Sequence, residues 1–176
     1  MCILNQYEKH CFNPLTDEAK TLPNKMGLYM ICIKDKDKDN LPVTMKDVIF
    51  REIEGLPLIL YIGISAKQGL RKRDYRNHFA GTARNSTLRK SLGSLFKWKS
   101  DRYEHKDGKY KFNKDREDQL SEWMHKNLLM FYWIIDGNVS DLEKVLINEI
   151  SPPLNLGKNK SLINYEFRKS LSYLRS

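Results

Sequence analysis

The sequence predicts a mixed α/β (α+β) fold in which helices cover a small sheet. Three short apolar runs, rich in aromatic and β-branched residues, indicate buried strands at 26–33, 58–64 and 128–135. Helical patterns separate the second run from the third, an order that is typical of helices packed on one sheet. We expect the first two strands to pair antiparallel, because they are close in sequence.

Residues 1–25 form a lead-in to the first strand. They are of mixed composition and contain Pro14 and Pro23, so we expect irregular or partly helical structure. After the first strand, residues 34–40 carry alternating charges, which is typical of a solvated loop or hairpin tip. The following segment, Val43–Arg51, fits either a short strand or a short helix.

Two helical patterns follow the second strand. The basic segment Leu70–Phe79 predicts a helix that ends near Gly81. In Ser86–Trp98 the apolar side chains fall at i, i+4, i+7 and i+8, which is the stripe of a surface helix. The residues of this stripe are Leu88, Leu92, Leu95 and Phe96.

The rest of the chain predicts one hairpin and three more helices. Asp107-Gly108, within residues 103–112, is a short hairpin signal. Pro152-Pro153 ends the second of these helices, because the residue before a proline is pushed out of the α region. The predicted helices are 115–127, 140–150 and 165–174.

Positive charge is concentrated in one part of the chain. Residues 66–111 contain 14 Lys/Arg and 4 Asp/Glu, a net charge of +10, whereas the whole chain carries +9. The remainder is therefore close to neutral. A basic block in an otherwise neutral protein favours binding of a polyanion, and a solvated helical face is the simpler alternative.

Length and cysteine content limit the class of protein. The 176 residues fit one domain that buries a core without crosslinks. Cys2, Cys11 and Cys32 have no C-x-x-C spacing, which argues against a disulfide scaffold or a zinc site. No apolar run approaches the roughly 20 residues of a membrane span, and the N-terminus lacks the apolar core of a signal peptide. We expect a cytoplasmic protein that does not contact membranes.

Five short motifs occur in order between residues 26 and 156. They are Gly27-Leu28-Tyr29, Tyr61-Ile62-Gly63, the Arg/His segment 70–79, Leu142-Glu143 and the Pro-Pro-Leu-Asn segment 152–155. As a set they resemble the GIY-YIG nuclease superfamily, with Leu28 in place of isoleucine. Segments 86–93 and 121–124 resemble a prokaryotic subgroup, and the long interval from Tyr29 to Tyr61 is similar to that of restriction-endonuclease-like members.

The resemblance implies a fold, an activity and a set of site residues. The fold is a three-stranded antiparallel sheet with flanking helices at 26–156, with 1–25 as an N-terminal extension and 157–176 as a C-terminal helical extension of the same domain. The activity is metal-dependent endonuclease cleavage of DNA with one divalent ion, Mg²⁺ or Mn²⁺. The implied catalytic residues are Tyr29, Tyr61, Arg73, His78, Glu143 and Asn155.

Glu143 is the expected metal ligand, because a carboxylate is a natural oxygen ligand for a hard ion such as Mg²⁺. An alternative role is local, since Ser140 and Glu143 have the spacing of a capping box. The two roles predict different outcomes of substitution. Loss of a cap removes about 1 kcal/mol of stability, whereas loss of the metal carboxylate abolishes turnover and leaves the fold intact.

Tyr29 is the candidate general base, and Tyr61 is expected to orient the water or the phosphate. A free phenol has a pKa of about 10, so nearby positive charge must lower the pKa for this role. Glycine weakens a strand, so Gly27 and Gly63 beside the tyrosines indicate a close approach to the backbone. The alternative for each tyrosine is a half-buried strand residue with a hydrogen-bonded hydroxyl.

Arg73 is the expected bidentate phosphate ligand, with His78 as a proton relay or phosphate contact and Asn155 as a supporting hydrogen-bonding residue. Residues five apart diverge by about 140° on a regular α-helix, so Arg73 and His78 do not share a face there. Either the helix contains an extra residue, as in a π-bulge, or Arg71 takes the role of Arg73.

Other basic side chains are expected to contact nucleic acid. They are Arg71, Lys72, Arg76, Arg84, Arg89 and Lys90. The alternative functions are a non-catalytic nucleic-acid-binding module and a nuclease for RNA or structured DNA. Cleavage of both strands with one site per chain would imply a homodimer.

Overall fold

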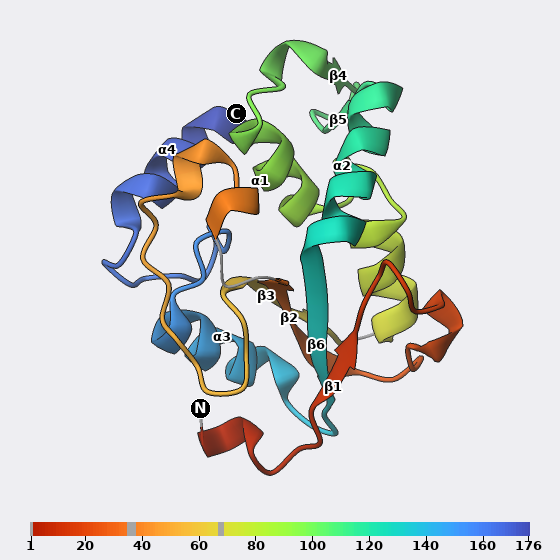
Figure 1. Ribbon diagram of the computed structural model, residues 1–176, viewed down its shortest axis with the longest axis vertical. Coiled ribbons are helices and arrows are strands. Elements are labelled where there is room, and N and C mark those ends of the chain that lie inside the picture. The colour runs from red at the N-terminus through yellow and green to blue at the C-terminus, as the bar shows by residue number, and fades with distance from the viewer. Residues whose placement is uncertain (1, 35–37, 67–68) are drawn as a thin grey trace.

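A four-stranded antiparallel sheet lies at the centre of the computed structural model, which describes residues 2–34, 38–66 and 69–176 (Figure 1). In spatial order the strands are β1 (His10–Phe12), β6 (Leu128–Ile134), β2 (Gly27–Ile33) and β3 (Ile59–Ser65). All neighbouring strands run antiparallel. The predicted α/β class and the pairing of the first two predicted strands are confirmed. Residues 35–37 of the predicted charged loop lie outside the described residues.

Strand β1 is an element that the sequence pattern did not predict. It pairs with β6, from His10 opposite Tyr132 to Phe12 opposite Met130, and the Phe12 ring is buried in the core. The prediction of irregular or partly helical structure over 1–25 is therefore wrong at this strand. The sheet also has one strand more than the three that the resemblance implies. Three residues are too few for an alternating apolar pattern to be recognised.

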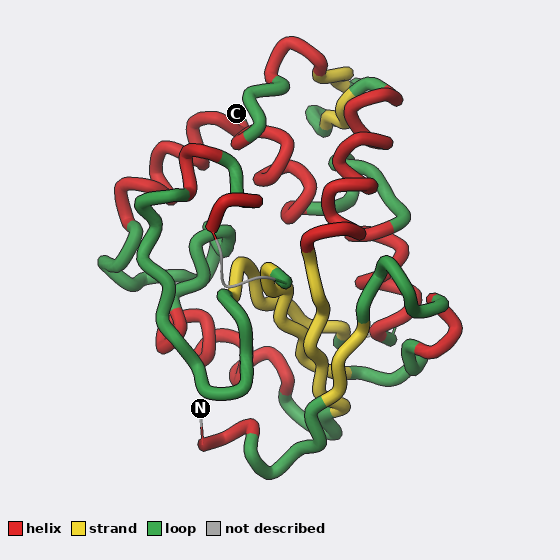
Figure 2. Tube along the Cα trace, viewed as in Figure 1, coloured by secondary structure: helices red, strands yellow, loops and turns green. Residues whose placement is uncertain are grey.

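The described residues contain four α-helices. They are α1 (Thr87–Leu95), α2 (Lys114–Asn127), α3 (Val139–Ile150) and α4 (Tyr165–Arg175). Each confirms a helix predicted from the sequence, with ends that differ by a few residues. Figure 2 shows that α3 lies apart from the other three, which are gathered beyond one end of the strands in this view. None of these described helices combines the length and the apolar character needed to cross a membrane.

Shorter elements connect the helices. The predicted hairpin is present as β4 (Arg102–Glu104) and β5 (Tyr110–Phe112), with Gly108 at a φ of 72° in its turn. Segment Val43–Arg51, for which a strand or a helix was expected, contains only the short 3₁₀ helix Val43–Met45. A π-helix, Arg71–Phe79, precedes α1.

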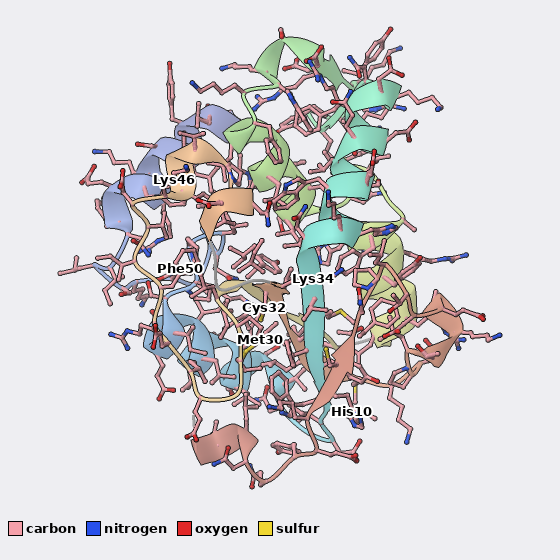
Figure 3. The ribbon with its side chains drawn as sticks, viewed as in Figure 1. His10, Met30, Cys32, Lys34, Lys46 and Phe50 are labelled. Atoms are coloured by element: carbon pink, nitrogen blue, oxygen red, sulfur yellow. The ribbon has the colours of Figure 1, made fainter. Side chains whose placement is uncertain are left out.

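Strand β2 is buried on both faces of the sheet, which explains its continuous apolar run. Ile31 belongs to a core that also contains Leu92 of α1. Met30 and Cys32, labelled in Figure 3, belong to a second core that contains Leu146 of α3. The sheet therefore separates two cores, and the side chains of β2 alternate between them.

A buried ion pair between Arg89 and Glu117 holds several elements together. The Arg89 guanidinium donates to Glu117 of α2 from Nη2 at 2.7 Å and from Nε at 3.0 Å, and to the backbone oxygen of His78 at 3.2 Å. The Glu117 Oε1 atom accepts the backbone N–H groups of Ala83 and Phe112. The pair therefore joins the π-helix, α1, α2 and β5 at one point.

The burial of Arg89 contradicts the prediction that this side chain contacts nucleic acid. Its side chain is 0% exposed. Burial lowers the pKa of Arg89, while the Glu117 carboxylate acts in the opposite direction, and an arginine keeps its charge inside proteins. Arg89 lies off the apolar stripe of α1, so the helical pattern indicated that its side chain is exposed to solvent. The side chain is buried instead, because it pairs with the Glu117 carboxylate of α2.

We predict that Arg89→Ala lowers the free energy of unfolding by about 3–5 kcal/mol, because the Glu117 carboxylate is left buried without its partner. The double variant Arg89→Met/Glu117→Gln should lose much less, since it removes both charges and keeps an acceptor for Ala83 and Phe112. Urea unfolding followed by circular dichroism measures both. Lys114→Ala, which breaks an exposed pair with Asp118, should leave stability close to that of the wild type. Equal effects of Arg89→Ala and Lys114→Ala would contradict the prediction.

Candidate active site

The Tyr29 hydroxyl is held inside the fold by a histidine. It lies 2.8 Å from Nε2 of His78, and the two residues are only 2% and 6% exposed. The other ring nitrogen, Nδ1, lies 2.7 Å from Oγ of Ser86. Ser86 is the N-cap of α1, and its hydroxyl accepts the Arg89 backbone N–H. A chain of hydrogen bonds thus runs from the phenol through the imidazole to the start of α1.

This chain of hydrogen bonds can accept the phenol proton. The Ser86 oxygen has two lone pairs, so it can accept an Nδ1–H in addition to the Arg89 N–H. With Nδ1–H directed at Ser86, the Nε2 atom of His78 is an acceptor that faces the Tyr29 hydroxyl. His78 can therefore take the phenol proton, which is the change that a general base at Tyr29 requires.

Gly63 leaves the space that the Tyr29 ring occupies. The two residues lie opposite each other in the β2–β3 pair. A Cβ atom at position 63 would lie 2.3 Å from the Tyr29 hydroxyl oxygen and 2.4 Å from its Cζ atom, so a side chain there would displace the phenol. The close approach predicted beside a strand glycine is confirmed, and the approaching group is the tyrosine itself.

Tyr61 lies beside this pair and is half-buried. Its ring centroid lies 6.3 Å from that of Tyr29 and 5.8 Å from that of His78. Its hydroxyl lies 3.3 Å from Oγ1 of Thr87, the first residue of α1. The two phenols and the imidazole therefore form one aromatic cluster, and Tyr61 is the member that also lines a cavity.

Asn155 holds the strand that carries Tyr61. Its Oδ1 accepts the backbone N–H of Ile62, and its Nδ2 donates to the backbone oxygen of Ile62, both at 2.8 Å. The neighbouring Leu154 N–H bonds to the backbone oxygen of Leu60 at 3.0 Å. Segment 152–155 thus covers the outer edge of β3, which agrees with the supporting role that the resemblance implies.

Glu143 faces the same cavity from α3, with 9% of its side chain exposed. Its carboxylate forms an ion pair with Lys158. The capping alternative is wrong, because α3 begins at Val139 and its N-cap is Asn138, whose side chain accepts the Asp141 N–H. Glu143 is therefore free of a capping role and is directed at the cavity.

Glu143 provides one carboxylate to which a hard cation could bind. In the described part of the chain, no three His, Cys, Asp or Glu side chains are grouped closely enough to enclose an ion. A single carboxylate that lines an open cavity fits Mg²⁺, which keeps several of its water ligands. Lys158 shows that this carboxylate already attracts a cationic partner.

The helix that carries His78 has the irregular geometry that was expected if Arg73 and His78, five residues apart, share a face. Arg71–Phe79 is a π-helix, and the Ala80 N–H bonds to the Tyr75 oxygen five residues earlier at 3.0 Å. This i→i+5 pairing aligns residues five apart, which is the separation of Arg73 and His78. The expected π-type irregularity is confirmed. The side chains of residues 72–74 lie outside the described structure, so the phosphate contact of Arg73 and the contact of Lys72 stay predictions.

The cavity has a volume of about 760 Å³ and brings together three of the predicted site residues, Tyr61, Glu143 and Asn155. Tyr29 and His78 are not among its lining residues, but their rings lie next to that of Tyr61, which does line it. Four basic residues complete the wall, and they are Lys90, Arg102, Lys158 and Arg175. The cavity therefore combines the Glu143 carboxylate with a mostly cationic surface, on which Glu104 is a second, exposed carboxylate.

The other predicted nucleic-acid contacts differ in exposure. Arg71 and Arg76 are exposed on the π-helix. Arg84 is half-buried and forms an ion pair with Asp107 at 2.9 Å. Lys90 lines the cavity. These four remain available to a polyanion, in contrast to Arg89.

Two residues of the site were not predicted from the sequence. Ser86 stands directly before an apolar-periodic helix, so its N-cap role could have been recognised, but not its bond to His78. Lys158 follows the last motif in an exposed loop, and no local pattern indicates that it pairs with Glu143.

Residues 27–176 match a family model described as the GIY-YIG catalytic domain. The match begins at Gly27, the first residue of the first tripeptide, and continues through Lys158 and α4. No curated protein and no solved structure gives a significant match to the chain.

We predict that Gly63→Ala lowers the free energy of unfolding by about 1–3 kcal/mol, because the new methyl group overlaps the buried Tyr29 ring. Combined with Tyr29→Ala, which removes the ring, the same change should cost less. The coupling in a double-mutant cycle should be about 0.5–3 kcal/mol. Gly157→Ala is the matched control, since a Cβ there meets no atom within 4 Å. Strict additivity of the two substitutions would contradict the overlap.

Proposed function

The chain belongs to the GIY-YIG nuclease family, and from this we propose that it is a metal-dependent endonuclease that hydrolyses phosphodiester bonds in DNA. One arrangement carries the proposal. The Tyr29–His78 hydrogen bond lies beside Tyr61, and Tyr61 lines the same basic cavity as Glu143. A base, a carboxylate for a cation and positive charge for phosphates are the groups that this hydrolysis needs.

Tyr29 acts as the general base in this proposal. The phenol proton passes to Nε2 of His78, 2.8 Å away, and the phenolate oxygen then accepts a proton from the attacking water. Ser86 orients the imidazole from the opposite side. A well-placed general base contributes about 10²- to 10⁴-fold in rate. Tyr61 orients the water or the phosphate, and Arg73 is the proposed phosphate ligand.

Glu143 would hold the divalent ion, Mg²⁺ or Mn²⁺. When bound, such an ion supplies neutralisation of negative charge on the phosphate and on the leaving oxygen. Lys158 adds positive charge beside the same carboxylate. Asn155 keeps β3, and with it Tyr61, in place through its two bonds to Ile62.

The basic block supports DNA as the substrate. Arg71, Arg76, Arg84 and Lys90 would contact phosphates, which supply most of the affinity of proteins for nucleic acid. Within this proposal the enzyme is a restriction-like nuclease of a prokaryotic cytoplasm. Cleavage of both strands requires two such sites, so a homodimer on the DNA is part of the proposal.

Two other functions would use the same scaffold. A non-catalytic binding module needs the positive charge but has no use for the proton path from Tyr29 to His78. An RNA or structure-specific nuclease would use the whole site on another substrate. Nicking assays on duplex DNA, single-stranded DNA, flap DNA and RNA distinguish these activities.

We predict that Glu143→Gln lowers DNA nicking at least about 10³-fold, because several kcal/mol of charge stabilisation are lost with the metal carboxylate. The midpoint of thermal unfolding and metal-free DNA binding should stay close to those of the wild type. Plasmid nicking with and without Mg²⁺ measures the effect. Glu149→Gln, an exposed glutamate of the same helix, should keep its activity. The proposal fails if wild type nicks no DNA with Mg²⁺ or Mn²⁺, or if Glu143→Gln nicks equally fast.

We predict that Tyr29→Phe lowers the nicking rate about 10²- to 10⁴-fold, since the proton acceptor is lost. Removal of one buried hydrogen bond should cost only about 1 kcal/mol of stability. Single-turnover nicking and urea unfolding measure the two effects separately. Tyr173→Phe, at a tyrosine that is 74% exposed, should change neither. Full activity of Tyr29→Phe would exclude a base at this position.

A further inference from the structure

The cavity next to Glu143 extends to a second set of side chains. At this end, which we call the distal pocket, lie Lys90 of α1, Arg102 of β4, Tyr110 of β5 and Arg175 of α4. The five ordered motifs of the sequence do not include these four residues, although Lys90 lies in segment 86–93, which resembles a prokaryotic subgroup. They come from four different elements and meet only in the folded chain.

Positive charges crowd together in the distal pocket. The Arg102 guanidinium carbon lies 4.3 Å from the Tyr110 ring centroid, and the Lys90 ammonium lies 5.0 Å from it. Burial, followed by the charges of Arg175 and Lys109, lowers the pKa of Lys90. Such repulsion is unfavourable within the protein alone, and a bound anion would relieve it.

Two buried polar atoms of the distal pocket have no partner with hydrogen-bond geometry in the part of the chain that the structure describes. Tyr110 is 7% exposed, and within the described residues its hydroxyl has no partner with hydrogen-bond geometry. Burial lowers the pKa of Arg175, and its electrostatic and hydrogen-bonding interaction with the Tyr110 phenol acts in the opposite direction, but the two groups do not have the geometry of a full hydrogen bond. The Nε atom of Arg102 is likewise buried without a partner among the described residues. Buried polar groups are normally satisfied, so both atoms point to a ligand.

Arg102 is held in a fixed orientation. Its Nη2 donates to the Ser94 hydroxyl at 3.0 Å and to the backbone oxygen of Leu174, and its Nη1 donates to the Ser176 oxygen at 2.9 Å. These bonds hold both terminal nitrogens, and Nε is the guanidinium nitrogen that has no partner among the described residues. A donor that is already oriented loses less entropy on binding.

Acidic groups do not neutralise the distal pocket. Two acidic side chains line the whole cavity, and they are Glu104 and Glu143. Glu143 is paired with Lys158, and Glu104 is exposed to solvent. Lys90, Arg102 and Arg175 therefore outnumber Glu104 among the charged side chains that the structure describes around the distal pocket.

We propose that the distal pocket binds a phosphate of the substrate strand close to the one that is cut. Tyr110 and Arg102 Nε donate hydrogen bonds to it, and Lys90 and Arg175 supply charge. A phosphodiester fits because all four groups are donors or cations, and because the pocket is continuous with the Glu143 site. The proposal rests on the nuclease function. It adds a contact that positions the strand before cleavage.

The test is binding of a DNA duplex in EDTA at several salt concentrations. For Lys90→Gln, the slope of log K against log salt should fall in magnitude by about 0.9, the value for one phosphate contact on duplex DNA. For Tyr110→Phe, affinity should fall about tenfold with an unchanged slope, since a neutral hydrogen bond to a charged group is lost. Lys90→Arg should restore the slope.

The control is Lys114→Gln, whose side chain is 87% exposed on α2 and should bind DNA like the wild type. Circular dichroism of each variant verifies the fold. Wild-type affinity and slope in both Lys90→Gln and Tyr110→Phe would overturn the distal pocket and leave the nuclease function intact. Failure of the wild type to bind DNA would contradict the nuclease function, and with it the pocket.

Discussion

The buried ion pair between Arg89 and Glu117 is the constraint on which the geometry of the candidate site depends. Arg89 binds the backbone oxygen of His78, and its own backbone N–H is fixed by Ser86, which also contacts the imidazole. His78 is therefore positioned at both its backbone and its ring, and it in turn holds Tyr29. Buried pairs of this kind add little net stability over apolar residues. Such a pair instead fixes how the two helices and the groups bonded to them are placed, since any other arrangement leaves a buried charge without its partner.

The site combines two halves of the chain that are far apart in sequence. The strands β2 and β3 and the π-helix provide the phenols and the imidazole, whereas α3 and the segment after it provide Glu143, Asn155 and Lys158. Asn155 joins the halves through its bonds to Ile62. The Glu143 carboxylate, in a cavity whose charged residues are mostly basic, is an arrangement that attracts both a metal ion and a phosphate. Electrostatic attraction of this kind is strengthened in a partly buried cavity, where water screens charges less.

Much of the fold could be predicted from local patterns, because helices and strands bury their side chains at regular intervals. The three long strands and the four α-helices follow from such periods. The spacing of Arg73 and His78 anticipated the π-helix as one of two alternatives, because Arg73 can share a face with His78 only if the helix contains an extra residue, whereas Arg71 needs no such irregularity. The three-residue strand β1 has no period long enough to detect. Arg89 was predicted to be exposed, because the pattern of its own helix does not reveal that its partner Glu117 lies on another helix, 28 residues away.

By itself, the sequence determined which groups are present and where the backbone needs glycine. Gly63 beside Tyr61 signalled a close approach, and the ordered motifs indicated a nuclease. Only the tertiary structure decided that Tyr29 is the group above Gly63, that Glu143 faces a cavity instead of capping α3, and that Lys90 meets Tyr110. The physical reason is that the periodicity of a sequence depends only on the helix or strand to which a residue belongs. Ion pairs, cavities and proton paths form between elements that come from distant parts of the chain and pack together.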